Sequence, residues 1–409
     1  MKRYITTLAL VLLAAAGFST YYAFGSADHL PEYRLETLEG DANEAANLVL
    51  DGSYIGGKGS QPIKLSVQGI EYRSRESLYD AYITNARSWF DEQTGVKELI
   101  EQYPDFMRGK GEIRGLFANK EWAAYAEIPY ESSTGQSGKN INVDILNRNT
   151  GEAIDYTIPL SILSPEGLRE QAYIADVQLQ EDLLHVLVYQ NVIGGAVKAA
   201  SQHYDYIIEK NSGELLSSAA IEFIDESGNK LSPDSYESVQ SFNAEPKDYY
   251  VFSSVKKTTE PNRNISIEII GMYAYSYKSG NVIRLSNQAL QRNNKRSEPQ
   301  YMTGDQLYFT SYNRESIQVT SFSLETGERM EESLFLTLKQ LEADEIKTSF
   351  MRADRLFILY ANRNKLNVAV LNIKTGEQLY KGEVAASGNE QEQQIALSDI
   401  SLHSIGLRN

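Results

Sequence analysis

The feature that most constrains the fold is an internal repeat in the last three-quarters of the chain. Five segments share one layout: a polar start, an apolar and aromatic strand, a polar hairpin, a second alternating strand, and a turn of Thr or Ser followed by Gly. The alternation with period two, as at Val368 and Val370, is typical of half-buried strands. The repeated unit is thus a β-hairpin, and it occupies segments 121–152, 182–214, 248–281, 305–328 and 354–377.

The glycine of each turn marks the period. Glycines 151, 213, 280, 327 and 376 are expected to supply the positive φ of a tight turn, and they lie 62, 67, 47 and 49 residues apart. Four-stranded propeller blades recur every 40 to 50 residues or so, with insertions making some units longer. After each turn an apolar residue is expected to resume a strand, namely Ile154, Leu215, Val282, Met330 and Leu379.

A single hairpin unit cannot bury both faces of its sheet, whereas several units packed around an axis can. We therefore predict an all-β fold, a β-propeller of about six blades with five to seven admissible. The alternative is a pair of β-sandwiches. The C-terminal stretch 398–407 predicts a further strand, which should share a blade with residues 63–72 because propellers commonly close by pairing both ends of the chain.

Three of the turns carry a family resemblance. Residues 147–152, 324–328 and 372–377 resemble the turn of the PQQ-like (quinoprotein-type) β-propeller repeats, in which an Asp-x-x-Thr-Gly-Lys/Glu-like motif precedes a tryptophan. The resemblance covers about residues 110–380, but the tryptophan that should follow the turn is absent after all five turns. It therefore implies architecture only. It implies no quinone cofactor and no dehydrogenase activity.

The N-terminus reads as an export signal. Residues 5–24 contain no charge and follow Lys2 and Arg3, so the rest of the chain should lie outside the cytoplasm. Twenty helical residues span roughly the 30 Å core of a bilayer, and the aromatic residues near position 22 suit an interfacial belt. We expect residues 1–27 to be a signal anchor of a single-pass membrane protein, or alternatively a signal peptide cleaved near Ala27, which would give a secreted protein.

The composition limits the cellular compartment and the classes of partner that this chain is expected to have. The chain has no cysteine, which excludes disulfides and thiolate metal sites and suggests a bacterial exported protein. A net charge of −16 argues against nucleic acid and anionic lipid as partners. No cofactor is expected.

Residues 28–110 do not follow the repeat. Residues 48–50 and 63–72 are predicted as strands, with the glycines at positions 52–59 forming a turn region. Apolar residues spaced three and four positions apart predict helix over residues 77–107, broken near Gly95. We divide the chain into 1–27, an N-terminal region 28–110 whose helical insertion packs on the propeller, and blades over 111–409.

The sequence contains no recognisable catalytic, metal-binding or cofactor-binding set. The four histidines, at 29, 185, 203 and 403, show no metal-site spacing, and His185 lies inside a strand where a structural role is expected. Residues 52–58 have the spacing of a phosphate loop but lead into a strand instead of a helix. Two further weak signals are a calcium-like stretch at 225–229 and a basic patch of Arg292, Lys295 and Arg296.

These observations favour a membrane-anchored, non-enzymatic binding or sensing protein that uses a propeller to engage a protein or an envelope polymer. One alternative is an extracytoplasmic carbohydrate-active hydrolase or lyase, since scattered carboxylates could pair in the propeller channel. Another is an envelope assembly or folding factor, which an exposed apolar patch on the helical insertion would support.

Overall fold

We describe a computed structural model of the 409-residue chain. The part of the chain that the structure describes comprises residues 13, 16, 17, 30–56, 59–75, 96–131, 136–160, 169–193, 201–224, 228, 230, 235–238, 244–259, 265–285, 298–313, 315–330, 334–363 and 365–408. Most of the expected export segment therefore lies outside the described residues. Among the described residues, no helix is long and apolar enough to cross a bilayer.

The described residues form six antiparallel sheets of four or five strands, and one separate hairpin. Sheet I contains β27 (Ile400–Leu407), β2 (Leu48–Gly56), β3 (Gly59–Ser66) and β4 (Gly69–Tyr72). Sheet II contains β5 (Leu116–Ala118), β6 (Trp122–Glu127), β9 (Asn140–Asn147) and β10 (Ala153–Pro159). Sheet III contains β11 (Arg169–Gln180), β12 (Leu183–Ile193), β13 (Ser201–Glu209) and β14 (Leu215–Ala220).

The later sheets follow the same plan. Sheet IV contains β15 (Ser235–Ser238), β16 (Tyr249–Thr259), β17 (Ile265–Ser276) and β18 (Val282–Leu285). Sheet V contains β19 (Glu298–Thr303), β20 (Gln306–Tyr312), β21 (Ser316–Ser323) and β22 (Leu334–Thr337). Sheet VI contains β23 (Glu345–Arg352), β24 (Arg355–Asn362), β25 (Lys365–Asn372), β26 (Gln378–Ala386) and β1 (Tyr33–Gly40). The separate hairpin pairs β7 (Tyr130–Glu131) with β8 (Gln136–Ser137).

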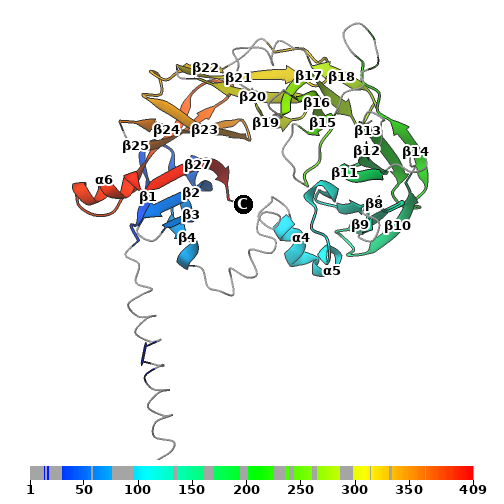
Figure 1. The fold of residues 1–409 in the computed structure, drawn as a ribbon, viewed down its shortest axis with the longest axis horizontal. Helices are drawn as coiled ribbons and strands as arrows, with labels where there is room; N and C mark the ends of the chain where they lie inside the picture. The colour runs from blue at the N-terminus through cyan, green and yellow to red at the C-terminus, as the bar shows by residue number, and fades with distance from the viewer. Residues whose placement is uncertain are drawn as a thin grey trace, which may run out of the picture.

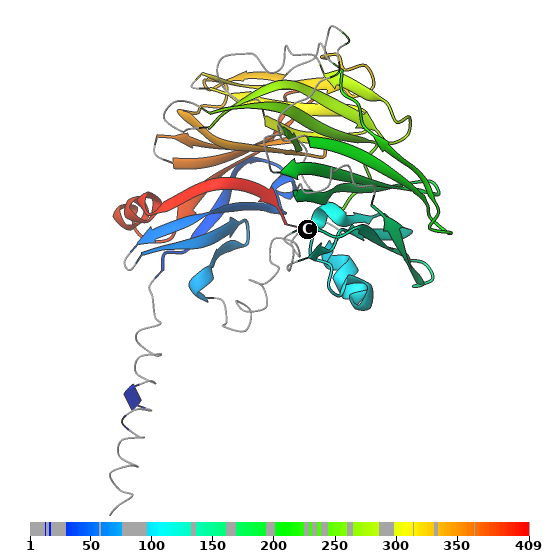
Figure 2. The same cartoon turned by 45° about the vertical axis from the view of Figure 1, so that its right-hand side comes forward.

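The six sheets stand around a common centre, as the blades of a β-propeller do (Figures 1 and 2). The first strand of each sheet lies toward the centre, and β23 contacts both β19 and β27 while β11 contacts β5. Hydrophobic clusters fill the spaces between consecutive sheets II–III, III–IV, IV–V, V–VI and VI–I. This confirms the predicted all-β fold. Two β-sandwiches would instead have grouped the sheets into stacked pairs.

The five repeats are the central hairpins of sheets II to VI with the turn that follows each hairpin. All five turn glycines have positive φ, between 68° and 76°, as predicted. In each turn the glycine N–H donates to the carbonyl four residues earlier at 2.8 to 2.9 Å. Strands resume after four of the turns. Met330 is the exception, since it follows its turn without lying in a strand.

Both ends of the chain share sheet I, as predicted. β27 pairs antiparallel with β2, so that Leu48 faces Leu407 and Tyr54 faces Ile400. β1 adds a fifth, outer strand to sheet VI by pairing with β26. The predicted turn region at residues 52–59 is wrong in part, because Gly52 and Gly56 belong to β2, and only positions 57–58 separate β2 from β3.

Short helices accompany the sheets. The helical prediction is confirmed over residues 96–107 by α4 (Val96–Gln102) and α5 (Pro104–Met107). Residues 76–95, with the predicted break near Gly95, lie outside the described residues. α4 and α5 bury Leu99 and Phe106 against Leu116 and Tyr125 of sheet II. They cover a face of sheet II that sheet III does not occupy. Between residues 30 and 408, the described residues also form α6 (Glu390–Ser398) before β27 and the single 3-10 turns at Ala42–Ala45, Arg73–Arg75 and Ile113–Gly115.

The antiparallel order gives the ring two distinct faces. Connections between first and second strands, and between third and fourth strands, meet on one side, which we call the turn face because it carries the five glycine turns. Hairpins between second and third strands, and the crossings from one sheet to the next, meet on the other side, which we call the loop face. The crossings are the longer connections, such as 161–168 between β10 and β11.

Candidate functional site

Three of the turn glycines are covered by the outer strand of the preceding sheet. A Cβ atom added at these positions would lie closer than 3.0 Å to that strand, so the strand or its side chain would have to shift. The nearest contact of such a Cβ is 2.2 Å to Cδ1 of Tyr156 for Gly213, 2.2 Å to the carbonyl O of Arg284 for Gly327, and 2.9 Å to Cδ1 of Leu334 for Gly376. The space beside each turn is therefore a slot that a neighbouring strand fills.

Within the described residues, two turn glycines are not covered in this way. Among those residues, a Cβ on Gly151 would have no atom within 4 Å, and one on Gly280 would meet only the hydroxyl of Tyr275 at 3.9 Å. Each of these glycines borders a cavity, of about 460 Å³ at Gly151 and about 360 Å³ at Gly280. We call the two cavities the Gly151 slot and the Gly280 slot. They are the candidate functional sites.

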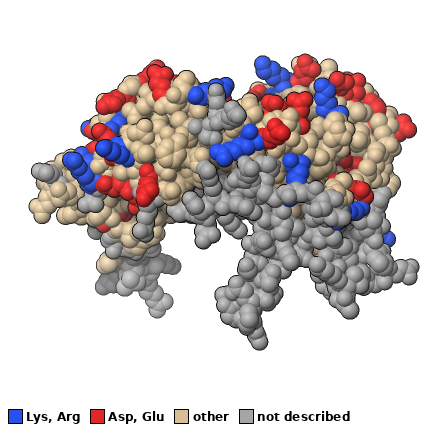
Figure 3. Space-filling model, turned by 90° about the horizontal axis from the view of Figure 1, so that it is seen from above, with Lys and Arg blue, Asp and Glu red and all other residues tan. Residues whose placement is uncertain are grey.

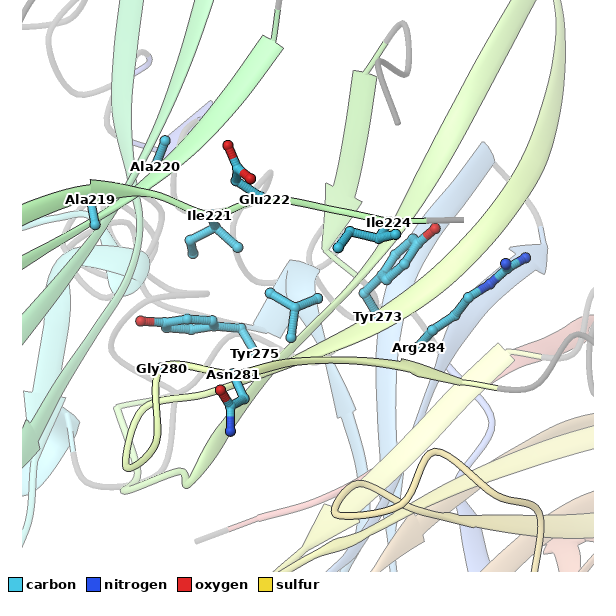
Figure 4. Close-up of a pocket in the computed structure, with 11 residues that line it drawn as sticks. Ala219, Ala220, Ile221, Glu222, Ile224, Tyr273, Tyr275, Gly280, Asn281 and Arg284 are labelled. Carbon is cyan, nitrogen blue, oxygen red and sulfur yellow. The ribbon is translucent and has the colours of Figure 1, made fainter. Parts of the chain in front are cut away.

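The Gly280 slot lies between the outer strand of sheet III and the outer half of sheet IV (Figure 4). Tyr273 and Tyr275 of β17 lie below the segment 219–224, from which Ile221 faces the space between them. Glu222 and Arg284 line the slot with charges of opposite sign. The carboxylate of Glu222 forms an ion pair with the exposed Lys230, with 2.5 Å between Oε1 and Nζ. The slot thus combines aromatic and aliphatic walls with charges of both signs.

One wall of this slot is tied to a buried polar group. The hydroxyl of Tyr275 donates to Oδ2 of Asp205 at 2.7 Å, and the same oxygen lies 2.7 Å from Nδ1 of His185. Burial raises the pKa of Tyr275 far above its ordinary value, and the carboxylate of Asp205 adds to the shift. His185 and Asp205 are 3% and 2% exposed, so they are closed to a ligand. This agrees with the structural role predicted for His185.

A second buried group joins sheets III and IV. The ammonium of Lys247 lies 3.2 Å from Oδ1 of Asp176, and Tyr277 donates to Oδ2 of the same carboxylate at 2.7 Å. Gln178 adds a hydrogen bond to Asp176 at 3.1 Å and accepts one from the backbone N–H of Lys247 at 2.8 Å. These charges are paired and nearly inaccessible, which assigns them to holding the two sheets together.

The remaining histidines carry no site in the described structure. His203 is 3% exposed, stacks on Phe252 with ring centroids 5.3 Å apart, and has its pKa lowered by burial to about 3. His403 is exposed on β27. His29 lies outside the described residues. Within the described part of the chain, no three His, Cys, Asp or Glu side chains are placed to hold a metal ion.

The Gly151 slot lies between α5 and the strands β9 and β10. Its walls include Phe106, and the buried Lys110 places its ammonium 4.5 Å from the Phe106 ring centroid and in an ion pair with Asp144. Asp155 lies directly across the β9–β10 ladder from Asp144 and lines the same cavity. This slot therefore has an aromatic wall, one buried cation and two neighbouring carboxylates.

The weak sequence motifs gain no support as sites. The phosphate-loop spacing at 52–58 falls on the β2–β3 hairpin, so no helix N-terminus is available for a phosphate. The basic patch at 292–296 and most of 225–229 lie outside the described residues. On the part of the surface seen in Figure 3, Lys and Arg are interspersed with Asp and Glu.

Sequence reasoning did not find the slots. The sequence signals each turn glycine but not which residue covers it, since Tyr156 and Gly213 are 57 positions apart and belong to different sheets. The covering atoms belong to the strand that follows the glycine of the preceding unit, as side chains at Gly213 and Gly376 and as a carbonyl at Gly327.

Comparison with known proteins gives no family. No protein-family model matches the chain, and no curated protein matches it. A solved structure of an uncharacterized protein from Listeria monocytogenes shares 12% identity over 67% of each chain, with a TM-score of 0.32. The acylaminoacyl peptidase of Pyrococcus horikoshii shares 10% identity over 64% of this chain and 44% of its own, with a TM-score of 0.30. The Dos1 propeller shares 11% identity over 64% of this chain and 65% of its own, with a TM-score of 0.28. This chain spans about two thirds or less of the length of these structures.

Proposed function

We propose that this chain is a membrane-anchored, extracytoplasmic binding or sensing protein built on a six-bladed β-propeller, and that it performs no chemistry itself. The observation that carries the proposal is the pair of open slots. Their equivalents in the same ring are each filled by a β-strand, through Tyr156 at Gly213 and Leu334 at Gly376. A slot of this shape fits an extended protein segment that places one side chain over the turn glycine.

The polar groups support binding over catalysis. His185 is paired with Asp205, and Lys247 with Asp176, inside the sheets. The walls of the Gly280 slot are mainly aliphatic and aromatic. Such walls with a few polar groups are common in binding sites. A protein segment is therefore favoured over an envelope polymer as the ligand.

Crosslinking from the slots tests this proposal. A photoreactive residue at Val282 in the Gly280 slot, or at Ile154 in the Gly151 slot, should crosslink to a partner in intact cells. One at Leu183, which is 36% exposed against 40% for Ile154 but lies in neither slot, is the matched control. Ala153→Glu, combined with the probe at Ile154, and Ala220→Glu, combined with the probe at Val282, should abolish the respective adduct. Equal labelling from Leu183 and the slot positions would refute the proposal.

Asp144 and Asp155 favour a second candidate, the carbohydrate-active hydrolase or lyase. Two carboxylates that share one cavity are the minimum set for glycoside hydrolysis. Here Asp144 already pairs with Lys110, which suits a fixed charge better than a proton donor. Release of reducing sugar from cell-wall polysaccharide, lost in Asp155→Asn but retained in Glu127→Gln on the neighbouring strand, would establish the enzyme and displace the binding proposal.

The anchor is part of the proposal and rests on the sequence. Residues 5–24 are uncharged and long enough to span a bilayer. Mass analysis of the N-terminus of the protein isolated from membranes tests this. A mature chain beginning near residue 28 would replace the anchored protein with a secreted one.

A further inference from the structure

The segment that joins the apolar N-terminal stretch to the ring is held at three points. The carbonyl of Pro31 accepts a hydrogen bond from the Tyr72 hydroxyl at 2.5 Å, and the carbonyl of Glu32 accepts one from the backbone N–H of Ser387 at 2.8 Å. The carboxylate of Glu32 also pairs with Arg75 at 2.8 Å. We call this set of contacts the clamp.

The next residue is fixed more deeply. Tyr33 is 2% exposed, and its hydroxyl donates to the carbonyl of Ala396 in α6 at 2.5 Å. The partners of residues 31–33 thus come from sheet I, sheet VI and the C-terminal helix. The chain cannot swivel freely at the point where it joins the ring.

The clamp lies on the loop face. β1 begins at Tyr33 opposite Ala386, the last residue of β26, and ends at Gly40 opposite Tyr380. The other end of β26 follows the turn of Gly376, which is on the turn face. β1 therefore runs from the loop face to the turn face, a path of eight residues and about 26 Å.

Chain length then decides which face can approach a membrane. Pro31 lies seven positions after Phe24, the end of the apolar stretch, and a fully extended chain reaches at most about 25 Å over seven positions. The headgroup layer itself takes up roughly 5 to 7 Å of this reach. A ring with its turn face toward the membrane would need the linker to cross the whole 26 Å of β1 as well, which it cannot do.

We propose that the loop face is apposed to the lipid surface of the membrane that anchors the chain, with the turn face directed away from it. This inference rests on the anchored protein proposed above. The lipid headgroup layer is the surface that this face meets.

The exposed tyrosines agree with this orientation. Among the described residues, the exposed tyrosines are Tyr130, Tyr173 and Tyr312, at 67%, 44% and 37%. Tyr130 lies just after β6 and Tyr312 is the last residue of β20, and both of these are second strands of their sheets. Tyr173 is near the start of the first strand β11. All three therefore lie toward the loop face. Tyrosine suits a membrane interface, because its ring is apolar and its hydroxyl is hydrated.

The absence of cysteine makes a direct test simple. Full-length single-cysteine variants Tyr130→Cys and Tyr312→Cys on the loop face, and Lys120→Cys and Lys278→Cys on the turn face, are labelled with a fluorophore. Each is reconstituted into phosphatidylcholine vesicles that carry a quencher on the lipid headgroup. Because the two faces are about 26 Å apart, we expect quenching at least about twofold stronger for the loop-face labels.

Two results would overturn the inference. Equal or stronger quenching of the turn-face labels in a chain that stays in the membrane fraction after carbonate extraction would refute the orientation alone. Recovery of the chain only in the soluble fraction would refute the anchor and the orientation together. As a test of the clamp, Tyr72→Phe should reduce the difference between the faces. Tyr360→Phe, whose hydroxyl has no hydrogen-bond partner within the described residues, should leave it unchanged.

Discussion

Replacing a turn glycine tests whether the sheets interlock at the slots. Gly213 and Gly151 have nearly the same backbone, with φ of 70° and 76°, and both follow the third strand of their sheet. They differ in their surroundings, since a Cβ on Gly213 would lie 2.2 Å from Tyr156 while one on Gly151 would touch nothing within 4 Å. The pair therefore separates the cost of left-handed backbone from the cost of overlap.

The expected magnitudes follow from these two contributions. Alanine in left-handed backbone costs about 1–2 kcal/mol, and this is the whole effect expected for Gly151→Ala. Forcing a methyl group into a packed contact adds about 1–3 kcal/mol, so Gly213→Ala should lower the free energy of unfolding by about 2–5 kcal/mol. Urea unfolding followed by far-ultraviolet circular dichroism measures both variants.

A third variant isolates the contact. Tyr156 donates its hydroxyl to the carbonyl of Asn211 at 2.6 Å, and its ring lies over Gly213. In a Tyr156→Ala background the overlap is gone, so Gly213→Ala should cost no more than Gly151→Ala does. If Gly213→Ala and Gly151→Ala lower stability equally in the unmodified chain, the covered-slot reasoning is wrong.

Three further predictions concern buried groups. Because burial lowers the pKa of His203 from 6.5 to about 3, the unfolded chain binds a proton below pH 6.5 that the folded chain does not. Stability should therefore fall by about 1.4 kcal/mol per pH unit from pH 6.5 toward pH 3 on this account, and urea titrations of His203→Phe should lack that part of the slope. Lys247→Met leaves the buried carboxylate of Asp176 without its cation and should cost about 3–5 kcal/mol of unfolding free energy, and a cost near zero would contradict the assigned ion pair. Tyr33→Phe should cost about 1 kcal/mol in thermal or urea unfolding because a buried carbonyl loses its donor, whereas Tyr360→Phe should be neutral or stabilising, and the reverse order would refute both assignments.

Local chemistry made the architecture predictable from sequence. A Thr-Gly or Ser-Gly pair after an alternating strand specifies a positive φ, and all five glycines have it. The hairpins before them follow from period-two alternation, and the pairing of β27 with β2 follows from the need to close a ring. Where local signals compete, prediction failed. Gly52 continues β2 because β3 and β27 pair on either side of it, and Gly56 continues β2 because it pairs with Gly59 of β3.

The candidate site could not be predicted, because it depends on contacts between sheets. Whether a turn glycine is covered is decided by an atom of the preceding sheet. The positive φ that the sequence signals is the same in the covered and the open turns. The buried network is equally remote in sequence, since Tyr277 meets Asp176 across 101 positions. Strand alternation marks such residues as inward-facing, but it does not say which polar group they meet.

The pairing of β27 with β2 has a consequence for how the chain matures. β2 is made early, while the strand that completes its sheet is made about 350 residues later. Until then the inner edge of sheet I offers unpaired backbone groups, so the nascent ring is prone to wrong partners. Contacts this distant also slow folding. We expect the growing chain to depend on a chaperone until β27 has been made and has paired with β2.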